Sequence, residues 1–233
     1  STGHDLDQQD GDDVSTEPYY SDEFVTLYHG DCREITAWLE ADVLVTDPPY
    51  GVAYESGGMD NGAAPLKVRI EGDKSPVVRD AALVAWGGRS AIVFGSWKVD
   101  RPVGVRHLLI WHKATRKPGF STAPWFSNHE DIYVIGGGFT GPPMASVITT
   151  HETRHGAAGE VAKIGHPTPK PVGLMSDLID KCPPGTIADP FAGSGSTLLA
   201  ARRMGRKVIG VELEERYCEI AAKRLAQHEL FVT

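Results

Sequence analysis

Cysteines and long apolar runs are both scarce in this sequence of 233 residues. The three cysteines, Cys32, Cys182 and Cys218, are odd in number and widely spaced, which argues against a disulfide framework and favours a reducing, cytoplasmic environment. No run approaches the roughly 20 apolar residues of a membrane-spanning helix, so we expect no membrane segment. The first residues are acidic and polar, so we expect neither a signal peptide nor a transit peptide.

Basic residues are missing from the first 23 positions, which instead hold eight acids. These acids account for the whole formal net charge of −8, because the rest of the chain has 23 acidic and 23 basic residues. A stretch with one sign of charge and no apolar periodicity is typical of a solvated, disordered tail. We therefore expect residues 1–22 to form an acidic tail and residues 23–233 to form the folded domain.

The rest of the sequence has an ordinary composition for a folded α/β domain, with 41% hydrophobic and 23% charged residues. Short apolar runs alternate with segments that have helical periodicity. This alternation predicts a single domain with a doubly wound, mostly parallel sheet. The predicted strands cover 24–28, 41–46, 90–94, 107–111, 130–135, 186–188 and 208–211, and the predicted helices cover 33–40, 79–87, 171–181, 196–204 and 214–227. Residues 51–76 and 136–168 are predicted to be loops.

Residues 186–212 have the order strand, glycine loop, helix, strand that is typical of nucleoside-cofactor sites. The loop carries Gly193 and Gly195, which let the backbone approach a ligand, and Glu212 follows the second strand, where an acid binds ribose hydroxyls. Leu198 stands where a dinucleotide-binding loop has its third glycine. The pattern therefore favours a nucleoside cofactor without a pyrophosphate.

Residues 47–50 read Asp-Pro-Pro-Tyr and follow the apolar run 43–45. Prolines fix φ and offer carbonyl groups without competing N–H groups. Tyr50 supplies a flat face for stacking, and Asp47 supplies an acceptor for an amino hydrogen. The motif therefore predicts a socket for a planar base that carries an amino group.

In this order, the Asp-Pro-Pro-Tyr motif and the later Asp-Pro-Phe-Ala-Gly-Ser-Gly segment resemble the amino-group DNA methyltransferase family with the β-type arrangement of motifs. Residues 166–171, His-Pro-Thr-Pro-Lys-Pro, are similar to a segment that precedes the glycine loop in that family. The resemblance covers residues 24–228. It implies the Rossmann-like fold of methyltransferases that depend on S-adenosylmethionine, and methyl transfer from this cofactor to an exocyclic amino group of DNA. Adenine N6 is the preferred target, since family members that act on cytosine N4 more often have Ser in place of Asp47.

The same resemblance assigns roles to individual residues. The catalytic residues are Asp47, Pro48, Pro49 and Tyr50. The cofactor-binding residues are Asp31, Cys32, Thr168, Lys170, Asp189, Phe191, Ala192, Gly193, Ser194, Gly195, Ser196 and Glu212. Of these, Asp31 lies near the cofactor adenine in the family, and Thr168 and Lys170 match positions beside its methionine end. A second interpretation of Asp31 is that it caps a helix that begins near Arg33.

The expected partner is double-stranded DNA, from which the target base must be flipped out because its amino group is otherwise stacked and paired. Basic and aromatic residues alternate over 98–120, and we expect this stretch to face the duplex together with a short target-recognition insert at 136–165. A second basic cluster at 202–207 is as well explained by a solvated helix end.

Other functions remain open at this point. Cytosine N4 methylation, amino methylation of RNA or protein, and a catalytically silent binding module share the cofactor half, although the intact residues 47–50 argue against the last. Residues 151–155 fit the pattern His-Glu-x-x-His, but they lack the apolar helix face of zinc enzymes, so we expect no metal site. The target sequence, a homodimer and a restriction partner are not specified by the sequence.

Overall fold

The computed structural model describes residues 17–50, 76–114, 124–151 and 169–229. These residues form a nine-stranded sheet with the strand order β1-β2-β9-β8-β3-β4-β6-β5-β7. The strands are β1 (Tyr20–Ser21), β2 (Val25–His29), β3 (Val43–Thr46), β4 (Ala91–Gly95), β5 (Val105–Lys113), β6 (His129–Ile135), β7 (Val147–Thr150), β8 (Ile187–Asp189) and β9 (Val208–Glu212). The helices are the 3₁₀ turn η1 (Ala37–Glu40), α1 (Val77–Trp86), α3 (Val172–Asp180), α4 (Ser196–Arg203) and α5 (Glu215–Glu229).

Five neighbouring strands, β2, β9, β8, β3 and β4, run parallel to one another. Beyond β4, strand β6 runs in the opposite direction, because it is antiparallel to both β4 and β5. Strand β7 is parallel to β5, so β5 and β7 both run in the direction of β4. The carboxyl ends of the five parallel strands therefore meet at one edge of the sheet. This arrangement confirms the predicted α/β domain with a mostly parallel sheet.

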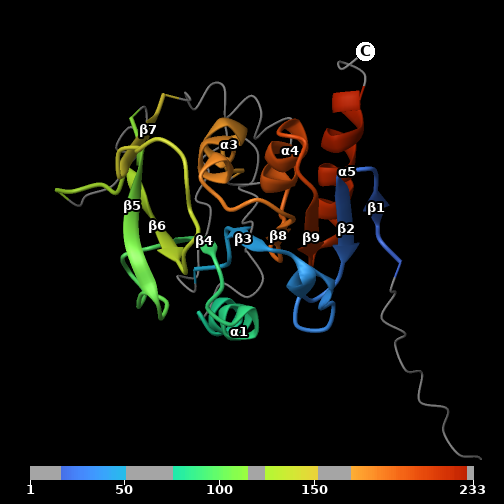
Figure 1. The fold of residues 1–233 in the computed structure, drawn as a ribbon, viewed down its shortest axis with the longest axis horizontal. Coiled ribbons are helices and arrows are strands. Elements are labelled where there is room, and N and C mark those ends of the chain that lie inside the picture. The colour runs from blue at the N-terminus through green and yellow to red at the C-terminus, as the bar shows by residue number, and fades with distance from the viewer. Residues whose placement is uncertain (1–16, 51–75, 115–123, 152–168, 230–233) are drawn as a thin grey trace, which may run out of the picture.

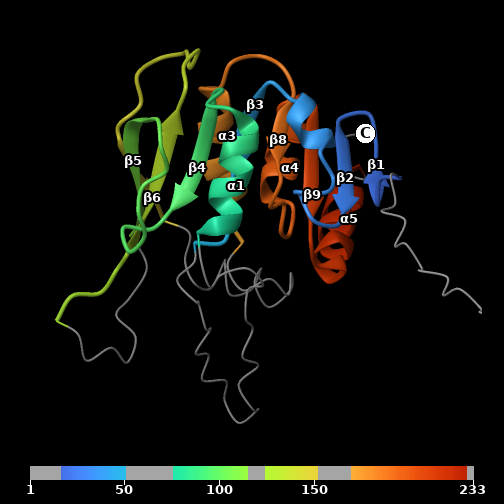
Figure 2. The ribbon, with the colours of Figure 1, turned by 90° about the horizontal axis from the view of Figure 1, so that it is seen from below.

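Helices cover both faces of the sheet (Figure 1). Helices α3, α4 and α5 lie on one face, and α1 and η1 lie on the other, where Figure 2 shows α1 crossing β3 and β4. The central strand β3 is buried along its whole length: Val43 and Val45 pack toward the first layer, and Leu44 packs toward the second. A strand covered on both faces must be apolar throughout, which explains its continuous hydrophobic sequence.

Two tryptophans and an arginine join the layer formed by η1 and α1. The rings of Trp38 and Trp86 are stacked with centroids 5.9 Å apart, and the Arg89 guanidinium lies 3.5 Å from the centroid of Trp86. Arg89 also donates hydrogen bonds to the carbonyls of Leu39 and Ala41, at 2.9 and 2.7 Å. The guanidinium thus satisfies carbonyls at the end of η1 while it packs on an aromatic face.

Two predicted elements differ from the structure. The predicted helix over 33–40 is only the 3₁₀ turn η1, because the chain first makes a tight turn in which the N–H groups of Glu34 and Ile35 both donate to the Asp31 carbonyl. The predicted loop at 136–168 contains strand β7. This strand is short and half-exposed, so its β-branched sequence lacks the apolar alternation that would have marked it. The other described elements match their predicted positions to within a few residues.

The predicted end of the acidic tail at residue 22 also differs from the structure, because β1 pairs with β2. The Asp22 carboxylate accepts hydrogen bonds from the N–H groups of Phe24 and Val25, both at 2.8 Å, and from the Tyr20 hydroxyl at 2.8 Å. Its second oxygen lies 3.3 Å from Nε of Arg202 in α4. Burial opposes the charge, but these hydrogen bonds hold the pKa of Asp22 below its usual value. The last acid of the tail is therefore part of the fold.

Substitution Asp22→Ala should lower the free energy of unfolding by about 1–3 kcal/mol, since two backbone donors lose a charged acceptor. The Asp22 pKa is depressed in the folded state, so its contribution is present above its ordinary value of 3.8 and is lost as the pH falls through the folded value. Denaturant titration at pH 7 measures the loss. Glu23→Ala removes an equal charge from the neighbouring exposed position, and an equal loss there would contradict a specific role for Asp22.

Candidate active site

The predicted site segments lie together at the carboxyl edge of the parallel strands. The register pairs His29 with Glu212 and Asp189 with Gly210, so the segments that follow β2, β9 and β8 are neighbours. Strand β3 lies next to β8 and delivers Asp47 to the same edge. In open α/β sheets this edge is where ligands bind. Thr168 lies outside the described residues.

The glycine loop is tied to the strands by Asp189, which is buried. Its Oδ1 atom accepts hydrogen bonds from the Thr46 hydroxyl at 2.6 Å and from the N–H of Phe191 at 3.2 Å. Burial raises the pKa of Asp189 to about 6. Asp189 therefore joins Thr46, at the end of β3, to Phe191, at the start of the loop.

The far end of the loop is held by α5. The Arg224 guanidinium donates to the Ser194 carbonyl at 2.6 Å, and Ala192, Ser194 and Ser196 are all buried. Gly195 has a φ of 81°, a left-handed conformation that favours glycine, and a Cβ there would lie 3.0 Å from Ala221 of α5. The loop backbone is thus fixed from both ends.

Glu212 lies between the glycine loop and the end of β9, with 9% of its surface exposed. Its Oε2 atom accepts from the N–H of Gly193 at 2.7 Å, and its Oε1 atom accepts from the N–H of Glu214 at 2.8 Å. Burial raises the pKa of Glu212 to about 7. Each carboxylate oxygen has two lone pairs, so Glu212 can still accept from a ligand hydroxyl.

Close packing of α4 on β9 does not need the third glycine that the sequence lacks. Gly210 of β9 provides the space instead, since a Cβ there would lie 2.8 Å from Cδ2 of Leu198 and 3.2 Å from Cβ of Ala192. Leu198, which departs from the dinucleotide pattern, therefore packs against Gly210 of β9.

Asp31 and Cys32 occupy the turn after β2. The Asp31 carboxylate accepts from the N–H of Arg33 at 2.8 Å and pairs with its guanidinium, and hydrogen bonding from Arg33 lowers the Asp31 pKa. Asp31 thus stabilises the turn before η1, and it does not cap a helix at Arg33, because η1 begins at Ala37 with Thr36 as its N-cap. Cys32 is buried, and burial raises the pKa of its thiol to about 12, so it is not a nucleophile.

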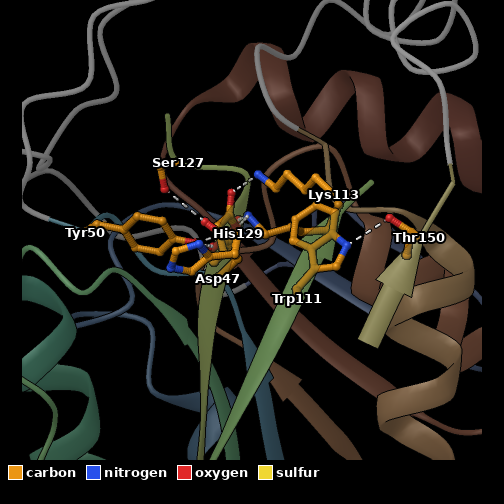
Figure 3. A network of polar contacts seen from close by, with 9 residues as sticks. Asp47, Tyr50, Trp111, Lys113, Ser127, His129 and Thr150 are labelled. Atoms are coloured by element: carbon orange, nitrogen blue, oxygen red, sulfur yellow. Dashed lines mark hydrogen bonds and ion pairs between the residues drawn. The ribbon is translucent and has the colours of Figure 1, made fainter. Parts of the chain in front are cut away.

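The Asp-Pro-Pro-Tyr motif follows β3 directly, and Figure 3 shows Asp47 and Tyr50 within a network of polar contacts. The Tyr50 hydroxyl lies 2.7 Å from Oδ1 of Asp47, and Lys170 forms an ion pair with Oδ2 of Asp47. Lys170 was predicted to bind the cofactor, and its ammonium lies on the Asp-Pro-Pro-Tyr motif, with 8% of the residue exposed. Pro48 is buried and lines a small cavity together with Phe191, so the motif lies near the start of the glycine loop.

A second carboxylate, which the sequence analysis missed, completes the motif. Glu130 of β6 has its Oε2 atom 3.1 Å from the Tyr50 hydroxyl and 3.2 Å from Nζ of Lys170. Its Oε1 atom pairs with Lys113 of β5, whose Nζ atom lies 4.3 Å from the ring centroid of Trp111. The one signal in the sequence was the pair of acids, Glu130 and Asp131, at the start of a strand that is otherwise apolar from Ile132 onward. Lys113, predicted to contact DNA phosphates, points instead into this network.

Three titratable groups of this network, Asp47, Glu130 and Tyr50, differ in their acid–base behaviour. Burial raises the pKa of Asp47, and the Lys170 charge only partly offsets that effect. Burial acts on Glu130 in the same direction, but Lys170 and Lys113 together lower the Glu130 pKa to about 2. Burial and the two carboxylates raise the pKa of Tyr50 well above its usual value, so its hydroxyl remains a donor. Glu130 thus has two cationic partners, Lys170 and Lys113.

The other predicted clusters are partly described. Among the described residues no group of three or more His, Cys, Asp or Glu side chains could hold a metal ion, and residues 152–155 of the His-Glu-x-x-His pattern lie outside them. In the second basic cluster, Arg202 and Arg206 donate to backbone carbonyls. Among all the residues that the structure describes, no helix is long and apolar enough to cross a membrane.

Residues 96–223 match the family of N6/N4 methyltransferases described as DNA methylase. The chain belongs to the DNA methylase family. This methylase is 29% identical over 217 residues to YubD, a candidate methylase of Escherichia coli (strain K12), with 84% of this chain and 88% of that protein covered. It is 28% identical to the type II methyltransferase M2.LlaDCHI of Lactococcus lactis subsp. cremoris, with 91% and 93% covered.

Solved structures confirm the fold of the methylase. The M1.HpyAVI–SAM complex superposes with a TM-score of 0.59 at 21% identity, covering 86% of this chain and 99% of that one. The PvuII DNA methyltransferase, which is cytosine-N4-specific, superposes with a TM-score of 0.63 at 16% identity, covering 89% and 88%.

The raised pKa of Glu212 predicts a pH dependence of stability. The folded value of about 7 exceeds the ordinary 4.5, so the folded state binds this proton more tightly and stability falls as the pH rises between the two values. Glu212→Gln should remove this fall, on the order of 1–3 kcal/mol. Melting curves from pH 4.5 to 8 measure it. Glu215→Gln, at an exposed position, is the control, and parallel curves for wild type and Glu212→Gln would refute the assignment.

Proposed function

We propose that this methylase transfers a methyl group from S-adenosylmethionine to the exocyclic amino group of a base flipped out of duplex DNA, with adenine N6 as the preferred target. The observation that carries the proposal is the position of Asp47 and Pro48, which follow β3 at the sheet edge beside the glycine loop. The family acts on amino groups of DNA, which leaves adenine N6 and cytosine N4 as candidates.

The residues at the edge suit S-adenosylmethionine. Glu212 ends β9, and Asp31 lies in the turn after β2, the strand paired with β9. The Glu212 carboxylate can therefore accept from the ribose hydroxyls, and the Asp31 carboxylate lies at the same edge of the sheet for the adenine amino group. The backbone of Gly193 and Gly195 leaves the ligand side of the loop without side chains. We assign a supporting role to the neighbouring loop residues, which hold the loop backbone in its conformation: Phe191, Ala192, Ser194 and Ser196. When bound, the cofactor supplies an electrophilic methyl group.

The catalytic motif acts on the target base. The Asp47 carboxylate and the Pro48 carbonyl accept the two amino hydrogens, which draws the nitrogen lone pair out of conjugation with the ring. The Tyr50 ring stacks on the base, and Pro49 restricts the backbone between them. Acceptors already fixed in place stabilise the positive charge that develops on the nitrogen, and alignment of the reactants lowers the entropic barrier.

Adenine is preferred on the identity of residue 47, since an aspartate is more typical of adenine N6 enzymes. Cytosine N4 is the second candidate, and the fold shared with the cytosine-N4-specific PvuII enzyme favours it. Mass spectrometry of nucleosides from unmethylated DNA treated with the enzyme separates the two. N6-methyldeoxyadenosine is the expected product, and N4-methyldeoxycytidine alone would reverse the assignment.

Recognition of the duplex is assigned to the β5–β7 end of the sheet. The predicted insert at 136–165 contributes β7, which pairs with β5 beside Trp111, and the Trp111 indole donates to the Thr150 hydroxyl at 2.9 Å. This contact joins the insert to the residues around Asp47. The remainder of the insert, 152–165, lies outside the described residues.

Asp47→Ala should slow methyl transfer by about 10²–10³-fold, because one preorganised acceptor of transition-state charge is lost. Single-turnover transfer of tritiated methyl groups, with saturating cofactor and unmethylated DNA, measures this step. Protein shown by its melting curve to be folded is required. A folded variant that retains more than about a tenth of the wild-type rate, far above the expected loss, would contradict the mechanism.

A further inference from the structure

Both hydrogen-bond donors that contact Asp47 are also within reach of Glu130. The Tyr50 hydroxyl is 2.7 Å from Oδ1 of Asp47 and 3.1 Å from Oε2 of Glu130. Lys170 pairs with Oδ2 of Asp47, and its Nζ atom is 3.2 Å from the same Glu130 oxygen. A hydroxyl has a single hydrogen, so Tyr50 can serve only one of the two carboxylates at a time.

This arrangement weakens the proposed role of Asp47 while the donors stay in place. Each Asp47 oxygen keeps a second lone pair, but an ammonium paired with Oδ2 compensates the negative charge that would stabilise the nitrogen, and it is a stronger competitor than a neutral amino group. Lys170 is almost fully buried, so releasing it from Asp47 without another partner would leave an uncompensated charge in the interior. A second acceptor for Lys170 is therefore needed at the moment when the base enters.

Glu130 is held where it can serve as that acceptor. Strands β5 and β6 pair Trp111 with Glu130, and Lys113 fixes Oε1 of Glu130 while leaving Oε2 directed at the shared donors. The Lys170 ammonium also lies 5.0 Å from the ring centroid of Phe94 and 5.8 Å from that of Trp111. These aromatic faces confine the cation between the two carboxylates.

We propose that Glu130 is a positioning residue that takes over Lys170 and Tyr50 from Asp47 when the target amino group arrives. The inference rests on the proposed role of Asp47 as acceptor. The transfer requires only small side-chain movements, because both donors already lie within hydrogen-bonding range of Glu130. Glu130 itself contacts neither the base nor the cofactor.

Substitution Glu130→Gln tests the proposal. The neutral amide can accept a hydrogen bond but cannot compensate the ammonium charge, so Lys170 stays on Asp47 and the single-turnover rate should fall about 10- to 100-fold, the change expected when one charge-assisted hydrogen bond is lost. Affinity for S-adenosylmethionine, measured by calorimetry without DNA, should remain unchanged. The Asp131→Asn variant is the matched control, because Asp131 is a buried carboxylate of the same strand that bonds to Tyr133 at 3.1 Å.

A second substitution distinguishes positioning from a structural role. In the double variant Glu130→Gln/Lys170→Met the competitor for Asp47 is gone, so methyl transfer should be faster than in Glu130→Gln alone. A residue that only supports the fold would show no such recovery, since the second change removes a further ion pair. Glu130→Asp keeps the negative charge on a shorter side chain and should give a rate between those of wild type and Glu130→Gln. If Glu130→Gln does not fold, Glu130→Asp takes its place in the double variant.

The outcomes separate this proposal from the proposed function. A wild-type rate in folded Glu130→Gln, or no recovery in the double variant, overturns the role of Glu130. If either result is found while Asp47→Ala is inactive in the same assay, only the role of Glu130 is refuted and the proposed function stands. If Asp47→Ala keeps its rate, the proposed function fails first and the role of Glu130 fails with it.

Discussion

The buried ammonium of Lys170 is the constraint on which the catalytic end of the sheet depends. A cation with so little exposure must be paired, and its two partners come from different parts of the chain, Asp47 after β3 and Glu130 at the start of β6. The pairing therefore links the segment after β3 to the start of β6, the strand that is antiparallel to β4. It also explains why Lys113 is directed inward, since Glu130 needs a second cation to remain ionised beside Asp47.

The cofactor half is ordered by backbone contacts rather than by ion pairs. Glu212 and Arg224 satisfy groups of the glycine loop from β9 and α5, and Asp189 fixes its beginning to β3. The loop therefore presents a fixed backbone at the strand ends, so little ordering is left for the moment of binding. Because Asp189 joins the loop to the residue before Asp47, the two halves of the site keep a constant separation.

Local patterns were sufficient to predict the Asp-Pro-Pro-Tyr motif, the glycine loop and Glu212, because each depends on residues close in sequence. The apolar runs likewise gave most strands and helices. Glu130 could not be predicted, because its function comes from contacts with Tyr50 and Lys170, which are 80 and 40 positions away in the sequence. Strand β7 escaped detection because an edge strand lacks a buried face, and the turn after Asp31 displaced a helix that periodicity favoured.

The strand order has a consequence for synthesis of the chain on the ribosome. Strands β8 and β9 lie between β2 and β3, although they are made more than 130 residues later than β3. A nascent chain that ends at α3 therefore has a gap two strands wide in the centre of its sheet and no glycine loop. The native sheet can close only after β9 has emerged, so newly made chains depend on a late, long-range step.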